Sequence, residues 1–121
     1  MITILVIDAD PTVRLIARRV LERAGCTVIA AADRGSAHTR LASLKVDVLI
    51  CDIGEDQNGG PSLRDLGSSD PGMRMLVLSR KDLSSPAESA GAGDILGKPF
   101  TESELLAAVR RSLAQSTPRS S

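Results

Sequence analysis

Residues 2–11 read ITILVIDADP, and this stretch decides the fold. Ile2–Ile7 is a nearly continuous run of apolar and β-branched residues, which is typical of a strand covered on both faces in a parallel sheet. Asp10 and Pro11 then mark a helix start, because aspartate is a favoured N-cap and proline fits the first helical turn. A buried strand that leads directly into a helix predicts an α/β domain.

The same alternation of strand and helix continues along the chain. We expect further strands at Cys26–Ala31, Val46–Cys51, Met73–Ser79 and Asp94–Gly97. Helices are expected from Pro11 to a stop at Gly25, at Arg34–Leu44, near 61–67, at Ser84–Ala90, and after Thr101, which forms a capping box with Glu104. This order implies a parallel sheet with right-handed crossovers and helices on both faces. The predicted domain covers residues 1–115, and residues 116–121 have the composition of a disordered tail.

The composition excludes several classes of function. Lys plus Arg equals Asp plus Glu, at 15 each, and Phe100 is the single aromatic residue, so we expect no nucleic-acid partner. The start of the chain has no basic leader and no run is long enough to span a bilayer, so we expect a soluble, cytoplasmic protein without a membrane partner. Arg14, Arg18 and Arg19 are predicted to form a solvated helix face. Cys26 and Cys51 lack metal or redox spacing and are predicted to be buried.

Polar residues follow the predicted strands at the edge of the sheet where open α/β folds place their functional groups. Asp8 and Asp10 follow the first strand, Asp52 the third and Lys98 the fifth, and Ser79 ends the fourth. Clustered carboxylates require a cation, and Mg²⁺ takes oxygen ligands while leaving room for phosphate. A carboxylate can attack phosphorus, and a lysine and a hydroxyl can hold phosphoryl oxygens. The pattern therefore predicts a phosphoryl-transfer site.

The motifs together resemble the receiver domain of two-component response regulators, of the chemotaxis-regulator kind. The resemblance rests on the run ILVIDADPTVR at residues 4–14, the acid after the third strand, the serine ending the fourth, and the triplet Lys98-Pro99-Phe100. It extends from Ile2 to about Leu113. It implies a doubly wound (βα)5, flavodoxin-like three-layer sandwich with a five-stranded parallel sheet in the order 2-1-3-4-5.

The resemblance also implies a role for each matching residue. Asp52 matches the phospho-acceptor, and Ser79 matches the switch hydroxyl that turns toward the phosphoryl group. Lys98 matches the lysine that pairs with acceptor and phosphate, and its proline neighbour Pro99 matches a cis-proline. Asp8 and Asp52, with the backbone carbonyl of Gly54, match the ligands of Mg²⁺.

The sequence departs from the family pattern at several positions. Ala9 stands in place of the second acid, so we expect weak Mg²⁺ binding. Asp10 could supply the missing ligand, although its role as N-cap is the simpler interpretation. Glu55 and Asp56 replace an apolar residue and a proline after the acceptor, and Ile95 replaces an aromatic residue associated with the switch. Arg80 replaces a small residue next to the switch serine.

Three functions remain in competition. The leading hypothesis is a receiver that takes a phosphoryl group on Asp52 from a histidine kinase or phosphotransfer protein, with Mg²⁺. It would signal through a downstream protein at the face formed by the helix at 84–90, the fifth strand and the last helix, with a homodimer as one option, and it would be no enzyme beyond self-phosphorylation and autodephosphorylation. The alternative is a degenerate receiver that binds partners without phosphorylation. A nucleotide- or flavin-binding domain is disfavoured, because the first strand is followed by no glycine-rich phosphate loop.

Overall fold

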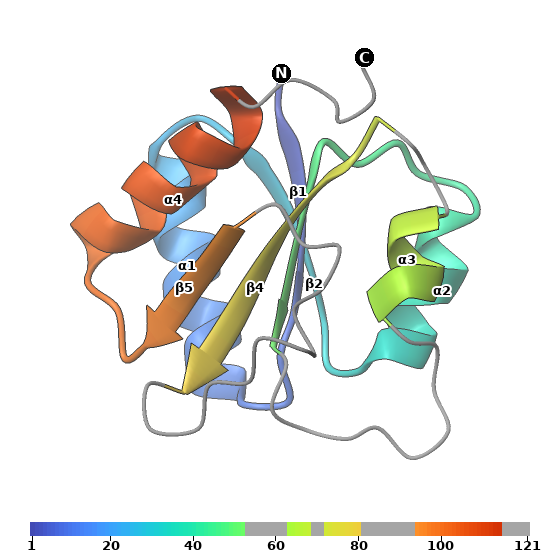
Figure 1. Cartoon of the computed structure of the whole chain (residues 1–121), viewed down its shortest axis with the longest axis horizontal. Helices are drawn as coiled ribbons and strands as arrows, with labels where there is room; N and C mark the ends of the chain where they lie inside the picture. Colours follow the sequence, from blue (N-terminus) through green and yellow to red (C-terminus); the bar gives the residue numbers. More distant parts are fainter. Residues whose placement is uncertain (53–62, 69–71, 81–93, 115–121) are drawn as a thin grey trace.

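A parallel sheet lies between two layers of helices in the computed structural model of the chain (Figure 1). The structure describes residues 1–52, 63–68, 72–80 and 94–114. All strand pairs are parallel and the order is β2-β1-β3-β4-β5, which confirms the predicted order. The strands are β1 (Thr3–Ile7), β2 (Thr27–Ala31), β3 (Val48–Asp52), β4 (Arg74–Arg80) and β5 (Asp94–Lys98).

The helices cover both faces of the sheet, as expected for a doubly wound fold. Helices α1 and α4 lie on one face, and α2 and α3 lie on the other (Figure 1). Their bounds are α1 (Pro11–Arg23), α2 (Arg34–Leu41), α3 (Leu63–Ser68) and α4 (Glu102–Ala114). The three-layer sandwich is therefore confirmed for the part of the chain that the structure describes. The helix expected at 84–90 and the tail at 116–121 lie outside the described residues.

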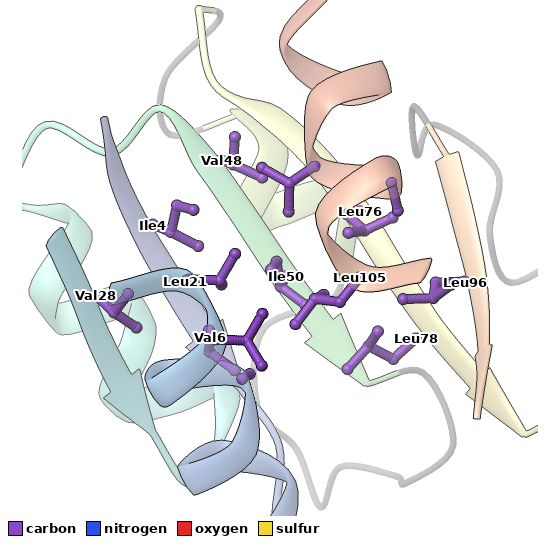
Figure 2. Packing of buried hydrophobic residues seen from close by; sticks show 14 residues of the cluster. Ile4, Val6, Leu21, Val28, Val48, Ile50, Leu76, Leu78, Leu96 and Leu105 are labelled. Carbon is purple, nitrogen blue, oxygen red and sulfur yellow. The ribbon is translucent and has the colours of Figure 1, made fainter. Parts of the chain in front are cut away.

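Strands β1 to β4 contribute side chains to two separate apolar clusters, one on each face of the sheet, whereas β5 contributes Leu96 to the first cluster alone. Figure 2 shows the first cluster, in which Ile50 of β3 and Leu78 of β4 pack with Leu21 of α1 and Leu105 of α4. The second cluster, on the α2 and α3 face, takes the intervening strand residues, such as Leu49 and Val77. Because both faces are covered, the strands are apolar along nearly their whole length, which is the pattern that the sequence shows.

Local signals fix the helix ends where the sequence predicts them. The Asp10 carboxylate accepts the Thr12 N–H at 2.9 Å, which confirms Asp10 as the N-cap of α1. Gly25 has a φ of 97°, a left-handed conformation that glycine adopts without strain. The capping box of α4 is also confirmed, since the Thr101 N–H donates to Glu104 at 2.8 Å and the Glu104 N–H donates to Thr101 at 3.1 Å.

Some predicted boundaries were wrong by one to three residues. Helix α2 ends at Leu41 rather than Leu44, because the Ala42 N–H bonds to the Thr39 carbonyl, three residues back, and the turn tightens there. Strand β3 begins at Val48 rather than Val46. The preceding residue, Asp47, instead caps the start of β1, where its carboxylate accepts the Thr3 N–H at 2.8 Å.

The two cysteines differ in their surroundings. Cys51 is buried, as predicted, whereas Cys26 is only half-buried, so the prediction for Cys26 was wrong. Cys26 precedes β2, an edge strand, and packs at the margin of the first apolar cluster. Across the described residues, we find no helix of the length and apolarity required to cross a membrane.

Ser112 on α4 offers a test of how this core is packed. Its side chain is fully buried, and its hydroxyl has no hydrogen-bond partner among the described residues. Because an unsatisfied buried hydroxyl destabilises a fold, Ser112→Ala should raise the free energy of unfolding by about 1 kcal/mol and Tm by about 4 °C. Thermal and urea unfolding would measure the change. The control is Ser103→Ala, at an exposed position of the same helix. The prediction would be contradicted if Ser112→Ala raised the free energy of unfolding by no more than Ser103→Ala does.

Candidate functional site

Three charged side chains from three strands meet at the carboxyl edge of the sheet. Asp8 directly follows β1, Asp52 is the last residue of β3, and Lys98 is the last residue of β5. The Lys98 ammonium lies 3.1 Å from Asp8 Oδ2 and 3.3 Å from Asp52 Oδ1. The side chains of Asp8, Asp52 and Lys98 are 2%, 13% and 17% exposed. Two carboxylates therefore share one cation at the sheet edge, and all three side chains have little exposed surface.

Asp8 is held from every side. Its Oδ1 accepts the Asp10 N–H at 2.9 Å, while its Oδ2 faces the Lys98 ammonium. Its own N–H donates to the Ala31 carbonyl on β2 at 3.2 Å, and its carbonyl accepts Arg14 Nη1 at 2.7 Å. The backbone of Asp8 is thus held by two hydrogen bonds, and its carboxylate cannot turn without breaking its contacts with the Asp10 N–H and the Lys98 ammonium.

The carboxylates of Asp8 and Asp52 both affect the pKa of Lys98. Burial by itself lowers the pKa of this ammonium, but the hydrogen bond and charge of Asp8, followed by those of Asp52, outweigh burial and raise the pKa above the ordinary 10.5. Lys98 is therefore a permanent cation at neutral pH. The Lys98–Pro99 peptide bond is cis, as the family resemblance implied.

The other predicted site residues are placed as follows. Ser79 is buried at the penultimate position of β4, and it follows Leu78, which pairs with Asp52 in the sheet register. Ala9 is exposed beside Asp8. The strand ends thus bring together Asp8, Asp52 and Lys98, with Ser79 on the strand between. Residues 53–62, which include Gly54, Glu55 and Asp56, and the side chain of Arg80 lie outside what the structure describes.

Sequence reasoning missed two arginines near the site. Arg14 was assigned to a solvated face, but its guanidinium turns back to the carbonyls of Asp8 and Ala9. The positive charge of Arg34, at the start of α2, acts on the thiol of Cys51, the neighbour of Asp52. Burial raises the pKa of Cys51 to about 11, and the charge of Arg34 opposes this rise only in part. The one available signal was position, since each arginine lies in the first turn of a helix that follows a strand end.

The site has the chemistry to hold one hard cation. Asp8 and Asp52 both contact the Lys98 ammonium, so two carboxylates are present at this edge of the sheet. Mg²⁺ is commonly held by one or two carboxylates together with water and phosphate oxygens. Within residues 1–52, 63–68, 72–80 and 94–114, no cluster of three or more His, Cys, Asp or Glu side chains is present. The carboxylates of Asp8 and Asp52 are of the ligand type that Mg²⁺ prefers, and the described residues would leave most positions around such an ion to water or phosphate.

Comparison with known proteins agrees with this geometry. The family model of the response regulator receiver domain matches residues 4–110. The chain belongs to this family. The response regulator MprA of Mycolicibacterium vanbaalenii is 36% identical over 97% of this receiver domain and 52% of its own length. The chain thus spans about half the length of the curated relatives it matches.

Solved receiver structures share the fold. The chemotaxis protein CheY4 of Vibrio cholerae has a TM-score of 0.78 at 25% identity, over 93% of this receiver domain and 99% of that chain. A response regulator of Burkholderia pseudomallei, solved with a phosphorylated aspartic acid, a calcium ion and citrate, has a TM-score of 0.77 at 29% identity. That match covers 89% of this chain and 66% of the other.

The two roles considered for Asp10 lead to different outcomes on substitution. Asparagine keeps the oxygen that caps α1 but removes the charge, whereas alanine removes both. If Asp10 acts only as the N-cap, Asp10→Ala should lower the free energy of unfolding by about 1 kcal/mol, and Asp10→Asn should change little. Chemical unfolding and calorimetric Mg²⁺ titration of both variants would test this. A marked loss of Mg²⁺ affinity in the stable Asp10→Asn variant would instead identify Asp10 as a metal ligand.

Proposed function

We propose that this receiver domain accepts a phosphoryl group on Asp52, with Lys98 and a bound Mg²⁺ neutralising the charge. The observation that carries the proposal is the shared ion pair, in which one ammonium contacts the carboxylates of Asp8 and Asp52 at the strand ends. An arrangement of this kind suits phosphoryl transfer, where positioning and charge neutralisation supply most of the catalysis.

The geometry favours Asp52 over Asp8 as the nucleophile. Asp8 is 2% exposed, and its two carboxylate oxygens already accept hydrogen bonds from Asp10 and Lys98. Asp52 has a side chain that is 13% exposed and lies at the very end of β3, where a donor can approach from beyond the sheet edge. A carboxylate that attacks phosphorus must be reachable, so Asp52 is the acceptor and Asp8 is the fixed partner.

In the proposed transfer, one bond to phosphorus forms as another breaks. A carboxylate oxygen of Asp52 forms a bond to phosphorus as the bond from phosphorus to the donor breaks. The donor leaves as imidazole when it is a phosphohistidine, or as acetate when it is acetyl phosphate. Lys98, which already contacts Asp52, neutralises the charge that develops on the phosphoryl oxygens. The Ser79 hydroxyl donates a hydrogen bond to one of these oxygens. Asp8, Asp52 and the Gly54 carbonyl are the groups that would hold a Mg²⁺ ion, which would supply further charge neutralisation.

The partners follow from the same proposal. The phosphodonor is a histidine kinase or phosphotransfer protein, and the relative from Burkholderia pseudomallei with a phosphorylated aspartic acid supports an acceptor carboxylate. The signal leaves through protein contacts at the face that includes β5, where Ile95 is exposed on the edge strand, and α4. No catalysis is assigned beyond self-phosphorylation and autodephosphorylation.

Intact mass after incubation with Mg²⁺ and acetyl phosphate tests the proposal directly. The wild-type chain should gain one phosphoryl mass, and Asp52→Asn should gain none, because the amide is not a nucleophile toward phosphorus. Lys98→Met should react far more slowly while leaving the acceptor in place. Phosphorylation that persists in Asp52→Asn would assign the acceptor elsewhere.

Alanine at position 9, where receiver domains have a second acid, supports a second candidate, a degenerate receiver that binds partners without phosphorylation. The two candidates differ in what a restored acid would do. For a working receiver, Ala9→Asp should lower the Mg²⁺ concentration for half-maximal phosphorylation by about tenfold, equivalent to about 1.4 kcal/mol, since it adds a charged ligand. Ala9→Asn, equal in size but neutral, is the control. A wild-type chain that stays unmodified at all Mg²⁺ concentrations, with reaction restored by Ala9→Asp, would establish the degenerate function.

A further inference from the structure

We propose that Arg14 is a positioning residue, which fixes the Asp8 carboxylate through the peptide bond between Ala9 and Asp10. The contacts that carry this inference are present without any ligand. Its consequence for phosphorylation of Asp52 rests on the proposed function.

Arg14 reaches back from the first turns of α1 to the segment that joins β1 to this helix. Its Nη1 donates to the Asp8 carbonyl at 2.7 Å and to the Ala9 carbonyl at 3.2 Å. Its backbone N–H donates to the Asp10 carbonyl at 3.1 Å, so the residue is anchored to the same segment at both ends. A charged donor on two carbonyls makes stronger hydrogen bonds than a neutral one.

The second carbonyl explains how the effect reaches the site. The Ala9 carbonyl and the Asp10 N–H belong to one planar peptide unit and point in opposite directions. Arg14 holds the carbonyl end, while the N–H end donates to Asp8 Oδ1 at 2.9 Å. Rotation of this peptide would break both contacts at once, so Arg14 sets the direction of the N–H that orients Asp8.

The relay then continues into the ion pair. Asp8 Oδ2 accepts the Lys98 ammonium at 3.1 Å, and Lys98 also contacts Asp52. Hydrogen bonds in a chain polarise one another, so a guanidinium on the exposed Ala9 carbonyl makes the Asp10 N–H a better donor to Asp8. The Asp10 N–H and the Lys98 ammonium thus bind the Asp8 carboxylate directly, and the Arg14 guanidinium acts on it through the Ala9–Asp10 peptide.

This role is specific to Arg14 among the arginines of α1. Arg18, one turn further along, contacts Glu22 at 3.1 Å, and both of these side chains are about half exposed. An exposed pair of that kind contributes little to stability or to the site. Arg18 is therefore a matched control, of the same residue type on the same helix.

The experiment compares Arg14→Met, Arg14→Lys and Arg18→Met in the full chain. The first readout is the hydrogen-exchange rate of the Asp10 amide, measured by NMR in metal-free protein. We expect Arg14→Met to speed this exchange by about tenfold, with the Leu5 amide in β1 unchanged. Arg14→Lys, which keeps a charge but loses the planar fork, should give an intermediate rate and remain folded. Arg18→Met should match the wild type.

The second readout is the Mg²⁺ concentration for half-maximal phosphorylation by acetyl phosphate. Because partners that orient a ligand typically change metal affinity by about tenfold or more, Arg14→Met should raise this concentration to that extent. A purely structural role would lower Tm without moving either readout. Unchanged exchange at Asp10 in Arg14→Met and Arg14→Lys would overturn the inference. A wild-type chain that cannot be phosphorylated would refute the proposed function, while the exchange rates would still decide the role of Arg14.

Discussion

The structure at the carboxyl edge of the sheet depends on one ammonium that serves two carboxylates. Asp8 and Asp52 would repel each other in a pocket of low exposure, and Lys98 lies within 3.3 Å of both. Removal of the cation would leave two shielded negative charges without compensation, which is far more costly than the loss of a surface ion pair. The position of Lys98 at the end of β5 therefore links this edge strand electrostatically to β1 and β3, whereas its backbone pairs only with β4.

The sheet makes this arrangement possible because its strands are parallel. Parallel pairing places every strand end of one polarity at the same edge, so residues more than forty positions apart in sequence become neighbours. The apolar strand interiors hold the register, since a slip by one residue would move buried side chains of both clusters to the wrong face. The charged groups can thus tolerate mutual repulsion because the positions of their backbones are set by the core.

Much of the fold and part of the site follow from the sequence for identifiable reasons. The strand order, the N-cap at Asp10, the helix stop at Gly25 and the capping box at Thr101 depend on local patterns or on a familiar topology. The joint contact of Lys98 with Asp8 and Asp52 is a matter of distance across three strands, which spacing along a chain does not encode. The contacts of Arg14 depend in the same way on a long side chain folding back.

On the proposed function, the loss of an acid at position 9 need not prevent phosphorylation. Among the described residues, two carboxylates, Asp8 and Asp52, contact a single ammonium, that of Lys98, so the site keeps an excess of one negative charge that a divalent cation would offset. On the proposed function, transfer replaces the charge of Asp52 by a phosphoryl group that carries about two negative charges. The phosphorylated pocket is then more negative than the free one, and a divalent cation is held more tightly in the product. An acid at position 9 would strengthen metal binding before the transfer, whereas the phosphoryl group itself strengthens metal binding after it.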